Sequence, residues 1–499
     1  MRLNKYSQNE SLEYFKENGY ITKVMDSIVF VLGLENGRIY DLVEIDERYV
    51  GIILELGKNT VGIGIFDENA NVNEMMEVKL LNQLAGLQIT EKVGATVLDV
   101  LGNVQYGESE ENLEDNVTEE KIYSDYFKIA RPIMDIASVK RPLQTGWLMI
   151  DSMIPVGKGQ RQLLLGNRQT GKTQIALNAI VNQKGRDVKC IYVSIGQKNV
   201  QIANVIEFLK KKGSFDYTTI VSSSAGDSLI AQYLAPYAGV ALAEKLRDEG
   251  NDVLIVYDDL TKHADAYRAI SLLLSRVPGR EAYPGDTFYI HSSLLERAGQ
   301  LNKDNGGGSI TALPIIETLA DDVASYIPSN VISITDGQIF LRSNLFASGQ
   351  KPAVDVGISV SRVGSDAQLP LVKSLSKGLN LILSQYAELK ELMMFDSDLD
   401  DEKLKLIHDG EILMELFKQN IHENYGDEFS CLLLFGFKEG MFDDLSKEKV
   451  ILLKKQLYIL FEKEEILQRT IAKELELSAI SENTGKAIKT FYNKCLEGV

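Results

Sequence analysis

The hydrophobic and polar residues of the chain follow three successive patterns, and the first predicts short strands. Runs rich in β-branched and aromatic residues occupy 27–32, 40–43, 51–56 and 60–66, with turn residues between them. Asn36-Gly37 lies between the first two runs, and this pair is typical of a tight hairpin. Strands at this spacing predict a small antiparallel β-barrel over residues 21–93, after a polar, helix-tending lead at residues 1–20.

From about residue 94 the second pattern alternates apolar runs with longer helical stretches. We predict strands at 162–165, 190–195, 253–257, 287–290 and 331–334. Helical periodicity separates them, for example at 174–182 and 229–246. This alternation is typical of a mostly parallel α/β sheet, so residues 94–368 are assigned to one α/β domain.

The third pattern begins where strand signals end, near Val360. Residues 369–499 are rich in Leu, Lys and Glu at helical spacing. Apolar positions such as Leu457, Phe461 and Ile488 fall on stripes of the kind that a helix buries on one face. The C-terminal region is therefore predicted to be a helical domain.

Length and composition place the chain among globular proteins of several domains. It has 499 residues, of which 44% are hydrophobic and 25% are charged, so two to four domains are expected. The sequence has no apolar run of about 18 residues that could span a membrane. The polar N-terminus also lacks the apolar core of a signal peptide. We expect a cytoplasmic protein, and any membrane association is expected to be peripheral, through partners.

Charge and cysteine usage argue against further classes of protein, although a local basic patch would still allow contact with nucleic acid. The 71 acidic and 53 basic residues give a net charge of −18, which repels nucleic acid. The acidic, low-complexity segment 107–116 predicts a solvated loop. Cys190, Cys431 and Cys495 lie in apolar runs without disulfide or zinc spacing, so they are predicted to be buried thiols. The four histidines show no metal-ligand spacing.

One segment carries a specific chemical signal. Residues 166–173 read G-N-R-Q-T-G-K-T, which fits the phosphate-binding pattern G-x-x-x-x-G-K-[ST] between a predicted strand and a predicted helix. Glycine at 166 and 171 allows a tight turn whose N–H groups face phosphate oxygens. Lys172 is expected to neutralise the β- and γ-phosphates, and the Thr173 hydroxyl to bind Mg²⁺. The candidates for binding ATP or ADP are Gly166, Asn167, Arg168, Gln169, Thr170, Gly171, Lys172 and Thr173.

Two later strands supply further candidates. Asp258 follows the apolar run 253–257, and the carboxyl end of such a buried strand faces the nucleotide, so Asp258 is expected to hold Mg²⁺ through water. Gln197 follows the strand at 190–195. Hydrolysis needs a group that orients or activates water, and glutamine is a far poorer base than a carboxylate. The sequence therefore predicts nucleotide binding but does not by itself predict catalysis.

The phosphate-binding loop resembles the R-Q-T-G-K-T loop of F-type ATP synthase α subunits. The catalytic β subunits of that family carry a loop of the type G-G-A-G-V-G-K-T instead. Further segments similar to α subunits lie at 142–146, 257–262, 278–286, 307–318, 334–340 and 360–365. The resemblance extends from about residue 21 to about residue 402 and is weak in the last hundred residues.

The resemblance implies a fold and an assembly. The implied fold consists of an N-terminal β-barrel, a RecA-like P-loop domain and a C-terminal helical bundle. It implies a subunit that binds ATP or ADP with Mg²⁺ in a ring of three α-type and three β-type subunits around a central γ-type shaft, with a peripheral-stalk subunit. The whole would be an ion-translocating ATPase at the cytoplasmic membrane. In this arrangement Gln197 replaces the catalytic glutamate of β subunits, and Arg362 is an arginine finger for the neighbouring β-type site.

Several alternatives remain beside this interpretation. Asn167 stands where the family usually has Asp, residues 196–200 depart from the family pattern, and the acidic segment 107–120 replaces a shorter basic one. A specialised F-type-like head that drives other machinery is therefore one alternative. A homohexameric export ATPase or an RNA translocase is another, but each needs a catalytic carboxylate where Gln197 stands. On spacing alone, Arg362 could also be a structural salt-bridge residue.

Overall fold

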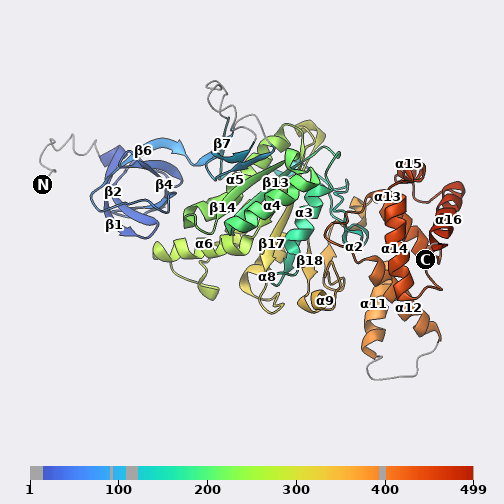
Figure 1. The fold of residues 1–499 in the computed structure, drawn as a ribbon. Helices are drawn as coiled ribbons and strands as arrows, with labels where there is room; N and C mark the ends of the chain where they lie inside the picture. Colours follow the sequence, from blue (N-terminus) through green and yellow to red (C-terminus); the bar gives the residue numbers. More distant parts are fainter. Residues whose placement is uncertain (1–14, 90–93, 108–121, 393–400, 498–499) are drawn as a thin grey trace, which may run out of the picture.

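The computed structural model describes residues 15–89, 94–107, 122–392 and 401–497. A closed barrel, an α/β domain and a group of helices follow one another along the molecule (Figure 1). This confirms the predicted fold class. Of the predicted acidic loop 107–120, all but Gly107 lies outside the described residues, as do residues 1–14 of the predicted lead.

The barrel is built from six antiparallel strands in the order β1-β2-β5-β4-β3-β6. They are β1 (Asn18–Met25), β2 (Ile28–Gly33), β3 (Asp41–Ile45), β4 (Tyr49–Leu56), β5 (Val61–Ile65) and β6 (Glu77–Leu84). Successive residues of one strand point to opposite faces. Val29 and Ile53 therefore fill the barrel, while their neighbours Ile28 and Ile52 pack in the core of the central domain. The barrel is thus attached to the central domain by one of its own faces.

The predicted hairpin at Asn36-Gly37 is wrong. Strand β2 pairs with β1 and β5, whereas β3 pairs with β4 and β6, so the turn joins strands that are not neighbours. The backbone N–H of Asn36 donates to the carbonyl of Lys16, at 2.9 Å. The connection therefore folds back onto the chain that precedes β1 instead of closing a two-stranded ribbon.

The central sheet has its parallel strands in the middle and antiparallel strands at its edges. Its order is β19-β18-β12-β17-β15-β13-β14-β8-β9, and the short strands β11 and β16 join beside β17. The bounds are β8 (Thr96–Leu98), β9 (Val104–Gly107), β11 (Ile136–Ala137), β12 (Leu163–Gly166), β13 (Val188–Gln197), β14 (Thr218–Ser224), β15 (Asp252–Asp258), β16 (Gly299–Leu301), β17 (Ser309–Glu317), β18 (Gly337–Leu341) and β19 (Val360–Ser361). A separate pair, β7 (Gly86–Ile89) and β10 (Ile122–Asp125), lies beside it. The strands predicted at 162–165, 190–195 and 253–257 are confirmed.

Two predicted strands are helices instead. The helices of the domain are α2 (Leu148–Met153), α3 (Lys172–Val181), α4 (Asn199–Lys212), α5 (Leu229–Asp248), α6 (Leu260–Leu273), α7 (Thr287–Leu295), α8 (Tyr326–Ile334) and α9 (Ser343–Ala347). Residues 287–290 begin α7, whose buried Ile290, Leu294 and Leu295 follow a helical spacing. Residues 331–334 end α8. A short, mostly apolar run fits a strand and a buried helix equally well, which is why the prediction failed here.

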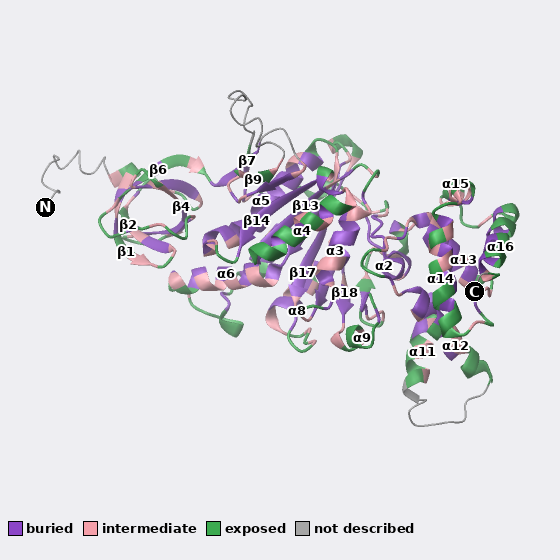
Figure 2. Cartoon of the chain, viewed as in Figure 1, coloured by how far each residue is buried: buried purple, intermediate pink, exposed green. Residues whose placement is uncertain are grey.

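The C-terminal region is helical, as predicted. Its helices are α10 (Pro370–Ser376), α11 (Leu379–Leu392), α12 (Asp401–Leu416), α13 (Asp427–Lys438), α14 (Lys447–Phe461), α15 (Glu465–Glu474) and α16 (Glu482–Leu496). The stripe residues Leu457, Ile488 and Tyr492 are fully buried. Figure 2 shows exposed faces on α14 and α16, in contrast to the almost wholly buried strands of the central domain.

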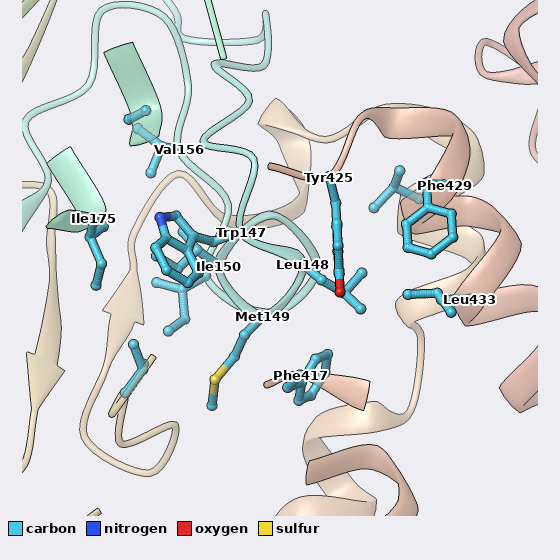
Figure 3. Close-up of a cluster of buried hydrophobic side chains, with 14 of the residues drawn as sticks. Trp147, Leu148, Met149, Ile150, Val156, Ile175, Phe417, Tyr425, Phe429 and Leu433 are labelled. Carbon is cyan, nitrogen blue, oxygen red and sulfur yellow. The ribbon is translucent and has the colours of Figure 1, made fainter. Parts of the chain in front are cut away.

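Helix α2 joins the central domain to the C-terminal helices. Figure 3 shows Trp147 and Ile150 facing the central domain while Leu148 approaches Tyr425 of the C-terminal region. All belong to one continuous hydrophobic core. The buried Gln419 adds polar contacts: its Oε1 accepts from the Leu148 N–H at 2.7 Å, and its Nε2 donates to the Gly146 carbonyl at 2.9 Å. The segment around Gln419 is therefore fixed against the central domain.

The remaining sequence predictions concern isolated residues and membrane association. The three cysteines are free and buried, as predicted. Within residues 15–89, 94–107, 122–392 and 401–497, no helix is long and apolar enough to span a membrane.

Candidate functional site

The loop between β12 and α3 depends on glycine at two positions. Gly166 has φ of +153°, and a Cβ there would lie 2.4 Å from the carbonyl oxygen of Leu341 on the neighbouring strand β18. Gly171 precedes α3 with φ of +100°, a conformation that other residues adopt only with strain. The turn places the first amide groups of α3, which have no acceptor within the helix, at the carboxyl edge of the sheet. A helix N-terminus in this position attracts anions.

Beside this loop lies a cleft of about 840 Å³, here called the P-loop cleft. Six predicted residues line it in sequence, from Arg168 to Thr173, and Gln197 and Asp258 line it too. They meet because β12, β17, β15 and β13 are successive parallel strands whose carboxyl ends share one edge. The structure thus brings these eight predicted residues together.

Asn167 braces the loop from behind. Its Oδ1 accepts hydrogen bonds from the Thr318 hydroxyl and the Asp321 N–H, each at 2.9 Å, and its Nδ2 donates to the Ser343 hydroxyl at 2.7 Å. Because its side chain is hydrogen-bonded to the segments that follow β17 and β18, Asn167 holds the loop in place. Gly166 likewise lies at the base of the loop rather than on the cleft wall.

Three donors surround the Asp258 carboxylate, which is almost wholly buried. Its Oδ2 accepts from the Thr173 hydroxyl and from the Tyr192 hydroxyl, each at 2.7 Å. Its Oδ1 accepts from Gln197 Nε2 at 3.1 Å. Because the Thr173 hydroxyl donates its hydrogen bond to Asp258, the lone pairs of its oxygen remain available to a cation.

This oxygen pair fits a magnesium ion that is held only partly by protein. Magnesium prefers oxygen ligands, keeps several waters, and commonly takes one or two protein ligands together with substrate phosphates. Thr173 and Asp258 provide such a partial set. In the described part of the chain, no group of three or more His, Cys, Asp or Glu could hold a metal alone.

Lys172 lies buried at the base of the cleft. Its Nζ donates to the carbonyl oxygen of Gly166 at 2.8 Å and also to that of Asn167. Burial lowers the pKa of this ammonium group from its ordinary value. Neutral carbonyls are weak partners for a buried cation, and phosphate oxygens would be stronger ones.

Asp259, next to Asp258, caps a helix and does not face the cleft. It accepts from the Lys262 N–H at 2.8 Å and so caps α6. Burial, reinforced by the neighbouring charge of Asp258, raises the pKa of Asp259 to about 7. It does not line the P-loop cleft.

Sequence reasoning missed part of the cleft wall. Glu317, at the end of β17, forms an ion pair with Arg168 at 2.9 Å. Another part of the wall is mostly apolar and includes Trp147, Phe346, Pro352 and Ile421, beside Lys351 and Gln419. Such a wall, with few polar groups, suits a planar ring such as a nucleotide base. Its residues come from separate segments and follow no local motif.

Arg362 lies outside the P-loop cleft, directly after β19. Its side chain is exposed, and its backbone N–H donates to the Asp336 carbonyl at 2.8 Å. The Asp336 carboxylate is instead held by Arg161, through two hydrogen bonds of 2.9 Å. Within the described residues, the Arg362 guanidinium makes no hydrogen bond or ion pair. Among the described residues, therefore, no acidic side chain pairs with Arg362 as a structural salt bridge would require.

Comparison with known proteins agrees with this geometry. Residues 146–361 match the ATP synthase alpha/beta family, nucleotide-binding domain, and residues 368–495 match the ATP synthase alpha/beta chain, C terminal domain. The chain is 55% identical over 438 residues to ATP synthase subunit alpha 1 of Listeria monocytogenes, covering 88% of this chain and 86% of that one.

Two further relatives extend the match. ATP synthase subunit alpha 1 of Mycoplasmopsis pulmonis is 44% identical over 94% of this chain and 86% of its own length. ATP synthase subunit alpha of Mycoplasma pneumoniae is 42% identical over 99% of this chain and 96% of its own length. Together with a closed barrel, a nucleotide-binding α/β domain and a helical C-terminal region, these matches show that the chain belongs to the family of ATP synthase alpha subunits.

Proposed function

We propose that this chain binds ATP or ADP with Mg²⁺ as the non-catalytic α-type subunit of an F-type rotary ATPase. The observation that carries the proposal is the composition of the P-loop cleft. It holds a phosphate-binding loop and an oxygen pair for a metal, yet an amide, Gln197, occupies the position beside Asp258.

Different residues of the cleft bind different parts of the nucleotide. The loop N–H groups and Lys172 bind the phosphate oxygens, and Thr173 and Asp258 hold the hydrated metal, which supplies positive charge against the phosphates. The apolar wall around Trp147 and Phe346 receives the base. Each contact lowers the free energy of the bound nucleotide without requiring a chemical step.

Hydrolysis also needs a side chain that activates the attacking water, and the candidates on the cleft wall already have other partners. A side chain must orient or deprotonate the attacking water. The Gln197 amide cannot take up a proton at neutral pH, and it already donates to Asp258. Glu317 is the other candidate on the wall, but its carboxylate is occupied by Arg168. This arrangement favours retention of ATP over turnover.

Arg362 supports the second half of the proposal. A guanidinium that is exposed and outside its own cleft is suitably placed to act on a neighbouring subunit. Arginine supplied in trans stabilises charge on a phosphoryl group during transfer. We therefore assign Arg362 to the catalytic site of an adjacent β-type subunit, in a ring of three plus three around a γ-type shaft. Peripheral-stalk and membrane contacts would come through partner subunits.

Co-expression with a β-type subunit tests the assignment of partners. We expect a ring with equal copies of the two chains, because a nucleotide-binding domain at a subunit edge leaves large faces uncovered in the monomer. Native mass spectrometry of the purified assembly gives the copy numbers directly. The control is the chain expressed alone. An active ring formed by this chain alone would overturn the proposal and favour a homohexameric motor.

A further inference from the structure

Tyr192 occupies an unusual place behind the P-loop cleft. It lies in the middle of β13, is almost completely buried, and donates its hydroxyl proton to Asp258 Oδ2 at 2.7 Å. Strands β13 and β15 are paired so that Ser194, two residues further on, lies opposite Asp258. Tyr192 therefore approaches the carboxylate from the interior of the sheet, whereas Thr173 approaches it from the loop.

The three hydrogen bonds to Asp258 fix how the carboxylate is turned. Oδ2 accepts from both Thr173 and Tyr192, and Oδ1 accepts from Gln197. Hydrogen bonds to a charged acceptor are stronger and more directional than those between neutral groups. Oδ2 is thus held between the loop and the interior of the sheet, and Oδ1 is held beside Gln197 on the cleft wall.

A second cavity makes this restraint necessary. It has a volume of about 390 Å³, lies between α3 and α4, and shares Thr173, Gln197 and Asp258 with the P-loop cleft. Tyr192 and Ser194 line its inner wall. The hydroxyl of Ser194 is buried and finds no partner in the described residues. Asp258 borders this cavity, so space is available into which the carboxylate could turn if the tyrosine hydroxyl were removed.

We propose that Tyr192 is a positioning residue for the bound magnesium ion: it holds Asp258 in the orientation that the hydrated metal requires. The inference rests on the proposed binding of Mg²⁺ with nucleotide and adds a residue to it. Such outer partners orient the groups that hold a metal, and their loss commonly lowers metal affinity about 10- to 100-fold. Because Tyr192 contacts Asp258 and lies outside the P-loop cleft, its effect should appear only when metal is present.

The test compares Tyr192→Phe with the unchanged chain by equilibrium binding of ATP, once with excess Mg²⁺ and once with a chelator. We expect the gain in affinity that Mg²⁺ confers to fall about 10-fold in Tyr192→Phe. The affinity measured with the chelator should stay unchanged. Ser194→Ala is the local control, since it removes a hydroxyl from the same cavity wall that makes no hydrogen bond. Tyr492→Phe is the stability control, since its hydroxyl donates to the Leu432 carbonyl at 3.0 Å in the C-terminal region.

A double substitution separates positioning from general damage. In an Asp258→Asn background, Tyr192→Phe should cause no further loss of the Mg²⁺-dependent gain, because the hydroxyl has no carboxylate to position. Equal losses with and without Mg²⁺, or additive losses in the double variant, would overturn the role of Tyr192. If the unchanged chain binds no ATP under either condition, the proposed function itself fails, which is a different result.

Discussion

Replacing Arg362 by lysine is expected to lower steady-state ATP hydrolysis by the assembled ring by about 10³-fold or more. Lysine keeps the positive charge but loses the planar fork of donors that matches phosphate oxygens. The residue is exposed, is free of ion pairs in the described part of the chain, and does not line its own cleft. The loss should therefore fall on turnover in the neighbouring subunit and leave nucleotide binding intact.

The measurement is steady-state ATPase activity of the variant ring beside a nucleotide-binding titration of both subunit types. Arg469→Lys is a matched control, since Arg469 is an exposed arginine on α15 that, among the described residues, pairs only with Glu465, four residues earlier. Near-normal turnover in Arg362→Lys would remove this residue from the mechanism. A variant that fails to form rings would identify it as a structural interface residue instead.

The second large effect is expected from Lys172→Ala. In the proposed binding mode the buried ammonium group contacts the phosphates, so its removal takes away charge-assisted hydrogen bonds worth about 1.5–3 kcal/mol each. Loss of two such bonds weakens ATP binding to this chain by at least about 100-fold. The ring should nevertheless keep a substantial fraction of its initial hydrolysis rate, because the proposed function assigns the catalytic sites to the partner subunits.

Binding is measured on the separate chain, and the initial rate is measured on the reconstituted ring. Lys211→Ala serves as the control, because Lys211 is an exposed lysine on α4 whose one ion pair within the described ranges is to Glu207. Immediate and complete loss of ring turnover in Lys172→Ala would contradict the assignment of this cleft as non-catalytic.

The sequence predicted those features of the cleft that depend on neighbouring residues. Gly166 and Gly171 had to be glycine for backbone reasons, so the loop motif located them. Asp258 and Gln197 stand at the carboxyl ends of buried apolar strands, so the local pattern of each strand located them too. Tyr192 was not predicted, because a tyrosine in the middle of an apolar strand looks like any core residue. Trp147 and Gln419 approach the cleft only through the packing of α2 against the C-terminal helices, which no local pattern encodes.

The fold shows the same division. Periodicity predicted the barrel, the sheet and the helical region. It did not predict the turn at Asn36-Gly37 or the state of short apolar runs. Strand β17 went unpredicted although it is central, because Pro314 within it argues against an interior strand. In the structure Pro314 lies near the end of the β15–β17 ladder, opposite Tyr257, where the missing N–H matters least. Strand β14 is equally buried but consists largely of Ser and Thr, so it lacked the apolar signal.

The most direct test of the central claim follows the fate of ATP bound to this chain alone. The purified chain is loaded with Mg²⁺ and ATP labelled on the γ-phosphate, and bound ATP and released phosphate are followed together, with Lys172→Ala as the background. We predict that ATP binds and stays intact, with phosphate release no faster than in Lys172→Ala, because general-base assistance worth about 10²–10⁴ in rate is missing. Steady phosphate release that requires Lys172 would contradict the account and make this cleft a catalytic site.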